Sequence, residues 1–88
     1  MVTMSTPHTS PARRTQLSLL VASNVRAEMA RQQKGLSDLA EILHIGSRAA
    51  SARHKGDQPF SLNEIATLAP WLGVTVDYLF SEPAALAS

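Results

Sequence analysis

Four glycines divide this chain into short stretches, and within each stretch the apolar residues recur at helical spacing. The glycines stand at positions 35, 46, 56 and 73. Apolar residues three or four positions apart share one face of an α-helix, whereas a half-buried strand shows alternating apolar and polar residues. No stretch of the chain shows that alternation. The sequence therefore predicts an all-α fold, a compact bundle of about five short helices.

The apolar spacing and the signals at helix ends set the expected bounds. We expect helices at about residues 16–33, 36–43, 47–54, 62–72 and 76–80. The clearest start is the capping box from Ser61 to Glu64, with Phe60 and Ile65 placed to form a hydrophobic staple. Pro70 should kink or shorten the last turn of its helix. The apolar stripes expected to face the core are Leu17, Leu20, Val21, Val25 and Met29; Leu36, Leu39, Ala40 and Leu43; and Leu62, Ile65, Leu68, Ala69 and Leu72.

Length and composition point to one small domain with loose ends. A chain of 88 residues buries only about 60–65% of its unfolded surface on folding, so its core is small. Residues 1–14 are rich in Thr, Ser and Pro without a periodic apolar pattern, and we expect a flexible N-terminal arm there. Residues 15–81 form the predicted domain, and residues 82–88 form a C-terminal tail.

Several classes of protein lack their usual marks in this sequence. There is no cysteine, which excludes a disulfide framework and a thiolate metal site. No apolar run approaches the roughly 18–20 residues that span a bilayer, and the first residues lack the apolar core of a secretion signal, so we expect a cytoplasmic protein. His8, His44 and His54 show no metal-ligand spacing, and no Gly-rich phosphate loop is present. We therefore expect neither an enzyme nor a cofactor, a metal or a small-molecule ligand.

The net charge of +1 conceals a separation of charge along the chain. Residues 1–55 hold eight basic and three acidic residues, a net charge of +5, whereas residues 56–88 hold four acidic residues and no Lys or Arg. The basic residues are Arg13, Arg14, Arg26, Arg31, Lys34, Arg48, Arg53 and Lys55. Unless it is chance in a short chain, this separation suggests one face for a polyanion and another for a different contact.

The segment RAASARHKG, residues 48–56, carries basic side chains on a helix that has no large apolar residue. In the expected helix Ala50 points back into the core, so the neighbouring positions face outward. An α-helix fits the major groove of DNA, and small side chains let its backbone approach closely. We interpret the segment as a surface that lies against DNA; the alternative is a solvated helix face.

Two longer segments carry a resemblance to a known family. LAEILHIGSRAASARHKG, residues 39–56, resembles the helix-turn-helix of the Cro and lambda-repressor-like family. PFSLNEIATLAPWLGVTVDYLF, residues 59–80, resembles the following helices of small repressors from actinobacterial phages and prophages. The resemblance covers about residues 20–80, most of the chain. It implies a lambda-repressor-like helix-turn-helix domain in which the third helix enters the major groove of double-stranded operator DNA.

The resemblance also implies which residues contact bases. In the family, the first two residues of the third helix commonly read bases, and these are Ser47 and Arg48 here. A bidentate pair between Arg48 and guanine contributes roughly 1–3 kcal/mol of discrimination. Ala52 suits the methyl group of thymine, and later positions meet bases or phosphates. The base-contacting residues that we expect are Ser47, Arg48, Ser51, Ala52 and Lys55.

A second set of residues is expected to contact phosphates, which position a protein on DNA without specifying sequence. Lys34 precedes the second helix, whose free N–H groups suit a phosphate, and Arg53, His54, Arg13 and Arg14 complete the set. For each of them, simple exposure to solvent is the alternative.

The sequence departs from the family pattern at three positions. Leu36 stands where a glutamine often clamps a phosphate, so that contact is in doubt. His44 stands where a glycine is common and where φ is often positive, which His tolerates at some cost. Gly46 replaces the usual serine cap of the third helix, which weakens the start of that helix slightly.

These observations predict a sequence-specific transcriptional regulator, a phage or prophage repressor of the Cro or immunity type that occludes a promoter. Such proteins usually bind as pairs, and the fifth helix with the tail is the candidate surface for a homodimer, in solution or only on DNA. The alternative is a protein-interaction module of the same fold, antitoxin-like or binding a host factor. Its candidate surface is the acidic, apolar C-terminal part with Trp71, Tyr78, Phe80 and Leu86.

Overall fold

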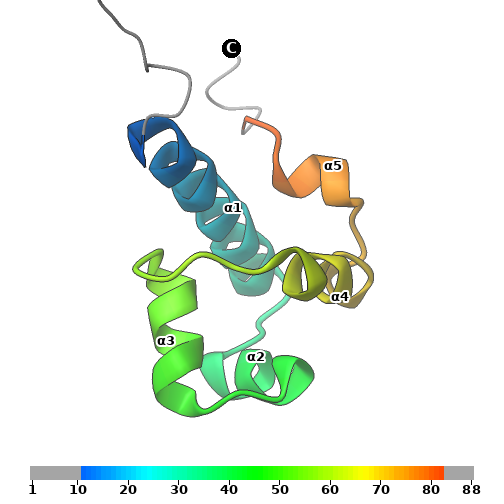
Figure 1. Ribbon diagram of the computed structural model, residues 1–88. Helices are drawn as coiled ribbons and strands as arrows, with labels where there is room; N and C mark the ends of the chain where they lie inside the picture. The colour runs from blue at the N-terminus through cyan, green and yellow to red at the C-terminus, as the bar shows by residue number, and fades with distance from the viewer. Residues whose placement is uncertain (1–10, 83–88) are drawn as a thin grey trace, which may run out of the picture.

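The computed structural model describes residues 11–82, and this part of the chain forms five helices and no strand (Figure 1). The helices are α1 (Pro11–Arg31), α2 (Leu36–Leu43), α3 (Ser47–Lys55), α4 (Leu62–Leu72) and α5 (Val76–Leu79). α1 contacts α3, α4 and α5, while α2 packs between α3 and α4. α2 and α3 lie together at one end of the molecule, and α5 lies toward the other end (Figure 1). The prediction of a small all-α bundle is confirmed.

The first helix is longer at its start than predicted. It begins at Pro11 rather than at residue 16, so residues 11–14 belong to its first turn and not to an arm. Proline suits this position because its fixed φ is already helical and its missing N–H has no partner to lose. The helix ends at Arg31, and Gln33 takes the left-handed conformation with φ 59°. The rest of the predicted arm, residues 1–10, and residues 83–88 of the tail lie outside the described residues.

The turn between α2 and α3 is built as the sequence suggested. His44 ends α2 in the left-handed conformation (φ 56°, ψ 45°), and the N–H of Ile45 donates to the Ala40 carbonyl at 3.0 Å. Ile45 packs against the core, and Gly46 caps α3 without a side-chain hydrogen bond. The predicted positive φ at His44 is confirmed.

A second tight position follows α3. Gly56 ends the helix with φ 93°, and a Cβ atom there would lie 2.8 Å from Cδ2 of Leu19 on α1. The backbone conformation therefore favours glycine at this position, and a Cβ atom would also require the end of the Leu19 side chain to move.

The start of α4 is fixed by the predicted capping box. The Ser61 hydroxyl accepts from the Glu64 N–H at 3.1 Å, and the Glu64 carboxylate accepts from the Ser61 N–H at 2.9 Å. Phe60 and Ile65 on either side of the cap are both buried. Pro70 does not end the helix, which continues two residues to Leu72. Only the Ala66 carbonyl loses a helical partner, because proline has no N–H to donate.

The core takes residues from every helix, but three leucines predicted to be buried are not. Leu17, Leu36 and Leu62 are 47%, 41% and 78% exposed. Leu36 and Leu62 are the first residues of α2 and α4, one turn before these helices reach their neighbours. The buried apolar residues are Val21, Ala22, Val25, Met29, Leu39, Ala50, Phe60, Ile65, Leu68, Ala69, Leu72 and Leu79.

Two side chains of α1, and Gln32 directly after it, hold the C-terminal ends of three other helices. Asn24 donates to the carbonyls of Leu79 and Ser81, both at 2.8 Å, at the end of α5. Gln32 donates to the carbonyl of Leu72, the last residue of α4, at 2.8 Å. Arg26 donates to the His54 carbonyl in the last turn of α3 at 2.7 Å. These carbonyls have no partner within their own helices, so α1 and Gln32 both satisfy and position the three helix ends.

Glu28 forms the one buried carboxylate cluster that the described residues show. Its carboxylate accepts from the Tyr78 hydroxyl at 2.7 Å and from the Arg31 guanidinium. The hydrogen bonds from Arg31 and Tyr78 hold the pKa of Glu28 below its usual value, against the opposing effect of burial. The cluster joins α1 to α5.

Within residues 11–82, no helix has the length and apolar character needed to cross a membrane.

Candidate nucleic-acid interface

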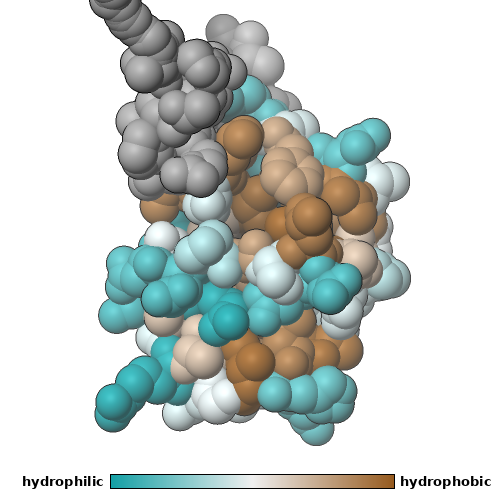
Figure 2. Space-filling view, in the orientation of Figure 1, coloured by the Kyte–Doolittle hydropathy of each residue, from teal (hydrophilic) through white to brown (hydrophobic). Residues whose placement is uncertain are grey.

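One shallow depression brings together the five residues that we predicted to contact bases. It lies on the outer side of α3 and includes two further residues, one from the start of α2 and one from the loop after α3. The lining residues are Leu36, Ser47, Arg48, Ser51, Ala52, Lys55 and Asp57. Ala50 is fully buried on the opposite side of α3, so the predicted helix phase is confirmed. The hydrophilic residues of this face gather over α3 and the loop that follows it (Figure 2).

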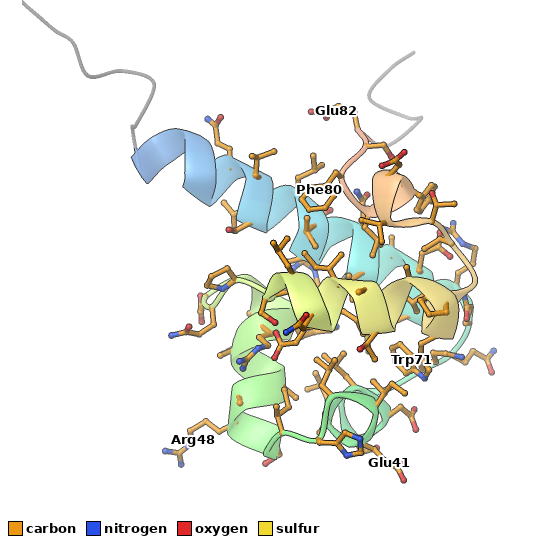
Figure 3. All side chains as sticks on the ribbon, turned by 45° about the vertical axis from the view of Figure 1, so that its right-hand side comes forward. Glu41, Arg48, Trp71, Phe80 and Glu82 are labelled. Atoms are coloured by element: carbon orange, nitrogen blue, oxygen red, sulfur yellow. The ribbon has the colours of Figure 1, made fainter. Side chains whose placement is uncertain are left out.

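Arg48 and Lys55 are the charged side chains of α3 that are free of intramolecular contacts in the described part of the chain. Both residues are exposed, and Arg48 projects from α3 away from the rest of the molecule (Figure 3). They stand seven residues apart, about two turns or 10 Å along the helix axis. The small side chains of Ser51 and Ala52 lie between them in sequence, so the helix presents two separated cations with low relief between them.

Arg53 has a structural role that differs from the predicted one. Its Nε donates to the Glu64 carboxylate at 2.9 Å, and its Nη1 donates to the Ala49 carbonyl at 3.3 Å. The side chain is only 23% exposed. Because Glu64 also caps α4, this ion pair ties α3 to the start of α4. A phosphate contact would have to use the remaining N–H groups of the guanidinium or compete with this ion pair, and it stays a prediction.

The charge of His54 bears on its predicted phosphate contact. The side chain is half-buried, and Arg26 donates to the residue's own carbonyl. Burial, and then the charge of Arg26, lower the pKa of His54 below its usual value near 6.5. The imidazole is therefore neutral at physiological pH and supplies no positive charge to a phosphate.

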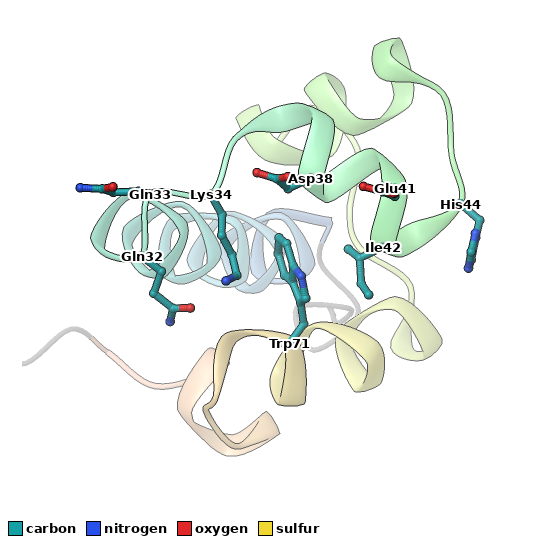
Figure 4. Close-up of a pocket in the computed structure, with 8 residues that line it drawn as sticks. All are labelled: Gln32, Gln33, Lys34, Asp38, Glu41, Ile42, His44 and Trp71. Atoms are coloured by element: carbon teal, nitrogen blue, oxygen red, sulfur yellow. The ribbon is translucent and has the colours of Figure 1, made fainter.

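Lys34 belongs to a different surface. Its Nζ lies 5.2 Å from the centre of the Trp71 ring, a cation–π contact visible in Figure 4. These two side chains line a separate depression between α1, α2 and α4, and none of the predicted base-contacting residues borders it. Its lining residues are Gln32, Gln33, Lys34, Asp38, Glu41, Ile42, His44 and Trp71. Arg13 and Arg14 lie in the first turn of α1, and their side chains lie outside the described residues.

Internal contacts therefore engage four of the six basic residues whose side chains the structure describes. Arg26 binds a carbonyl, Arg31 pairs with Glu28, Lys34 lies over Trp71 and Arg53 pairs with Glu64. Within the described residues, the freely presented cations are confined to α3. The candidate interface is thus smaller than the basic part of the chain, residues 1–55, suggests. It coincides with one face of α3.

Sequence reasoning missed two residues of the interface. Leu36 was expected to be buried, and Asp57 was read only as part of a turn. Asp57 folds back beside α3 because its N–H donates to the Ala52 carbonyl at 2.9 Å. The family pattern could have indicated the exposure of Leu36, because a polar residue is common at this position.

A search among protein-family models, curated proteins and solved structures finds no match to this chain. The resemblance to lambda-repressor-like proteins stays a prediction from the quoted segments.

Proposed function

We propose that this chain binds double-stranded DNA through the outer face of α3 and acts as a small sequence-specific transcriptional regulator. The observation that carries the proposal is the pairing of two unengaged cations, Arg48 and Lys55, with small side chains on an exposed helix face. The opposite face of the same helix packs against the core through the buried Ala50. The exposed face combines free positive charge with small side chains, and this combination suits the close approach of a helix backbone to the major groove.

In the proposed complex α3 lies in the major groove. Ser47, Ser51 and Ala52 keep the surface low enough for the backbone to approach the base edges. Arg48, the second residue of α3, is placed to donate two hydrogen bonds to guanine O6 and N7. Lys55, two turns further on, reaches either a base edge or the backbone of the opposite strand.

The proposal needs α3 to be held rigidly, because a base contact depends on sub-ångström placement of its donor. Arg26 and the Arg53–Glu64 ion pair both hold the last turn of α3, the first to α1 and the second to the start of α4. α2 supports the other side of the helix. The basic residues that do not face the proposed groove thus support the helix that does.

The sequence resemblance supports the more specific form of the proposal, a phage or prophage repressor of the Cro or immunity type that occludes a promoter.

Two-fold symmetric operators require two copies. An apolar groove between α1, α4 and α5, lined in part by Leu17, Leu62 and Phe80, is the surface for a second copy. The same groove favours the second candidate function, a protein-interaction module, because exposed apolar side chains border it beside the core.

Substitution of Arg48 tests the assignment of base contact. We expect Arg48→Ala to weaken binding to a selected DNA site roughly 5- to 150-fold, equivalent to 1–3 kcal/mol, and to relax preference at one base position. Competition with point-mutated sites measures both effects. Arg31→Ala, which removes the same charge from α1, is the matched control and should leave the base preference unchanged. Equal losses of specific and non-specific affinity in Arg48→Ala would contradict the assignment.

A further inference from the structure

We propose that Leu36 and Ala52 together form a contact for the C5-methyl group of a pyrimidine, beside the guanine read by Arg48. The inference rests on the proposed function, because it assigns part of the α3 depression to one chemical group of the bound DNA. Thymine carries this methyl group in the major groove, and 5-methylcytosine carries the same group at the same position.

The exposure of Leu36 is the first observation behind this inference. It is a large apolar side chain, 41% exposed, at the first position of α2. The residues that bind α2 to the core are Leu39, Ile42 and Leu43, of which Leu39 is fully buried. Leu36 is therefore not needed to close the core, and its side chain borders the same depression as the predicted base contacts.

The second observation is the chemistry of the whole depression. Leu36 and Ala52 are its apolar members, and the others are two hydroxyls, two cations and the carboxylate of Asp57. An apolar pair within a polar surface matches a methyl group within a polar groove. Removing one methyl group from such a contact costs about a fourfold loss of affinity.

Hydrogen bonding argues against a phosphate at Leu36 itself. Arg48 and Lys55 attract phosphates elsewhere along the depression, but a leucine offers no hydrogen bond to a phosphate oxygen. Base edges, which carry no net charge, are the part of DNA that suits this combination of side chains.

The test starts from a DNA site selected by the intact chain. Each thymine in turn is replaced by deoxyuridine, which lacks only the methyl group. We expect one position in each half-site to lose affinity about fourfold. At that position, 5-methylcytosine should bind more tightly than cytosine. The deoxyuridine series shows whether thymine supplies the methyl group, and the cytosine pair shows whether the contact accepts it from either base.

Two variants assign the effect to the proposed contact. In Leu36→Ala the difference between thymine and deoxyuridine should disappear, while recognition of the neighbouring guanine persists. Leu19→Ala is the matched control, because Leu19 is also an exposed leucine but lies on α1, outside the depression and outside the apolar groove. This variant should keep the full difference.

The outcomes separate this inference from the proposed function. A selected site whose affinity is unchanged by every deoxyuridine replacement would overturn the methyl contact and leave sequence-specific binding standing. An undiminished thymine preference in Leu36→Ala would do the same. A chain that selects no DNA site at all would overturn both.

Discussion

At the scale of single residues, buried and exposed positions of α3 require different side chains. Ala50 must be small because it is fully buried against its neighbours, while Ser47 three positions earlier is exposed at the helix start. Arg53, which looks like another DNA contact in the sequence, is engaged with Glu64. The type of residue alone does not separate these roles; its position around the helix does.

Glutamate placed at the two positions should have opposite effects on folding and binding. Ala50→Glu buries a carboxylate without a partner, and we expect it to lower the free energy of unfolding by about 3–5 kcal/mol. Ser47→Glu places the same charge at an exposed helix start, where it suits the helix dipole, so the protein should stay folded but lose DNA affinity. Urea unfolding and a binding titration measure the two effects. A normally stable Ala50→Glu protein would mean that the phase of α3 is wrong.

Glu28 links stability to pH. Its folded-state pKa lies below the usual value near 4.5, so the ionised carboxylate stabilises the folded protein above pH 4.5. This contribution is lost as the pH falls through the lower folded-state pKa. We expect the melting temperature of the intact protein to fall over that range more steeply than that of Glu28→Gln, which has no proton to take up. Parallel curves for the two proteins below pH 4.5 would contradict the role of Glu28.

At the scale of elements, α1 organises the fold by binding helix ends. Its Asn24 and Arg26, and Gln32 directly after it, each satisfy carbonyls in the last turn of another helix. The contact of Arg26 also fixes the C-terminal end of the proposed recognition helix. Short helices such as α5, with four residues, are marginal alone and depend on such tertiary contacts.

Removal of the Asn24 amide tests this dependence. Asn24→Ala leaves the carbonyls of Leu79 and Ser81 without their donor, and we expect a loss of roughly 1–3 kcal/mol in stability. Hydrogen exchange should become faster at the amides of α5 before those of α3. Asn63→Ala, at an exposed position of α4, serves as the control and should change stability by less than about 0.5 kcal/mol. Uniform protection of α5 in Asn24→Ala would show that another contact holds it.

At the scale of the whole molecule, the structure divides into a polar end around α3 and an apolar groove between α1, α4 and α5 (Figure 2). Phe80 lies between α5 and α1 in Figure 3, half-exposed at the edge of that groove. In the proposed assembly α3 binds DNA while a second copy occupies the groove, so that one molecule contacts both partners at once.

Features that depend on residues close together in the sequence could be predicted, whereas features that depend on contacts between distant segments could not. The starts of α4 and α5 were predictable because Ser61 and Thr75 cap them through residues three positions away. The start of α1 was missed because Pro11 was read as part of an irregular arm. The exposure of Leu36 and the pairing of Arg53 depend on which helices meet in space, and local spacing does not encode that. The α3 face was predictable because the buried Ala50 sets its phase.

The most direct test of DNA binding through α3 is a salt titration of the intact chain on genomic DNA fragments, with sequencing of the retained pool. We predict a steep loss of affinity with rising salt and one enriched, two-fold symmetric motif, because phosphate contacts release counterions and base contacts select sequence. Arg48→Ala should lose the preference at one base position of each half-site and keep most of the salt-dependent binding. Retention of no DNA at low salt would contradict the account and favour a protein partner for this fold.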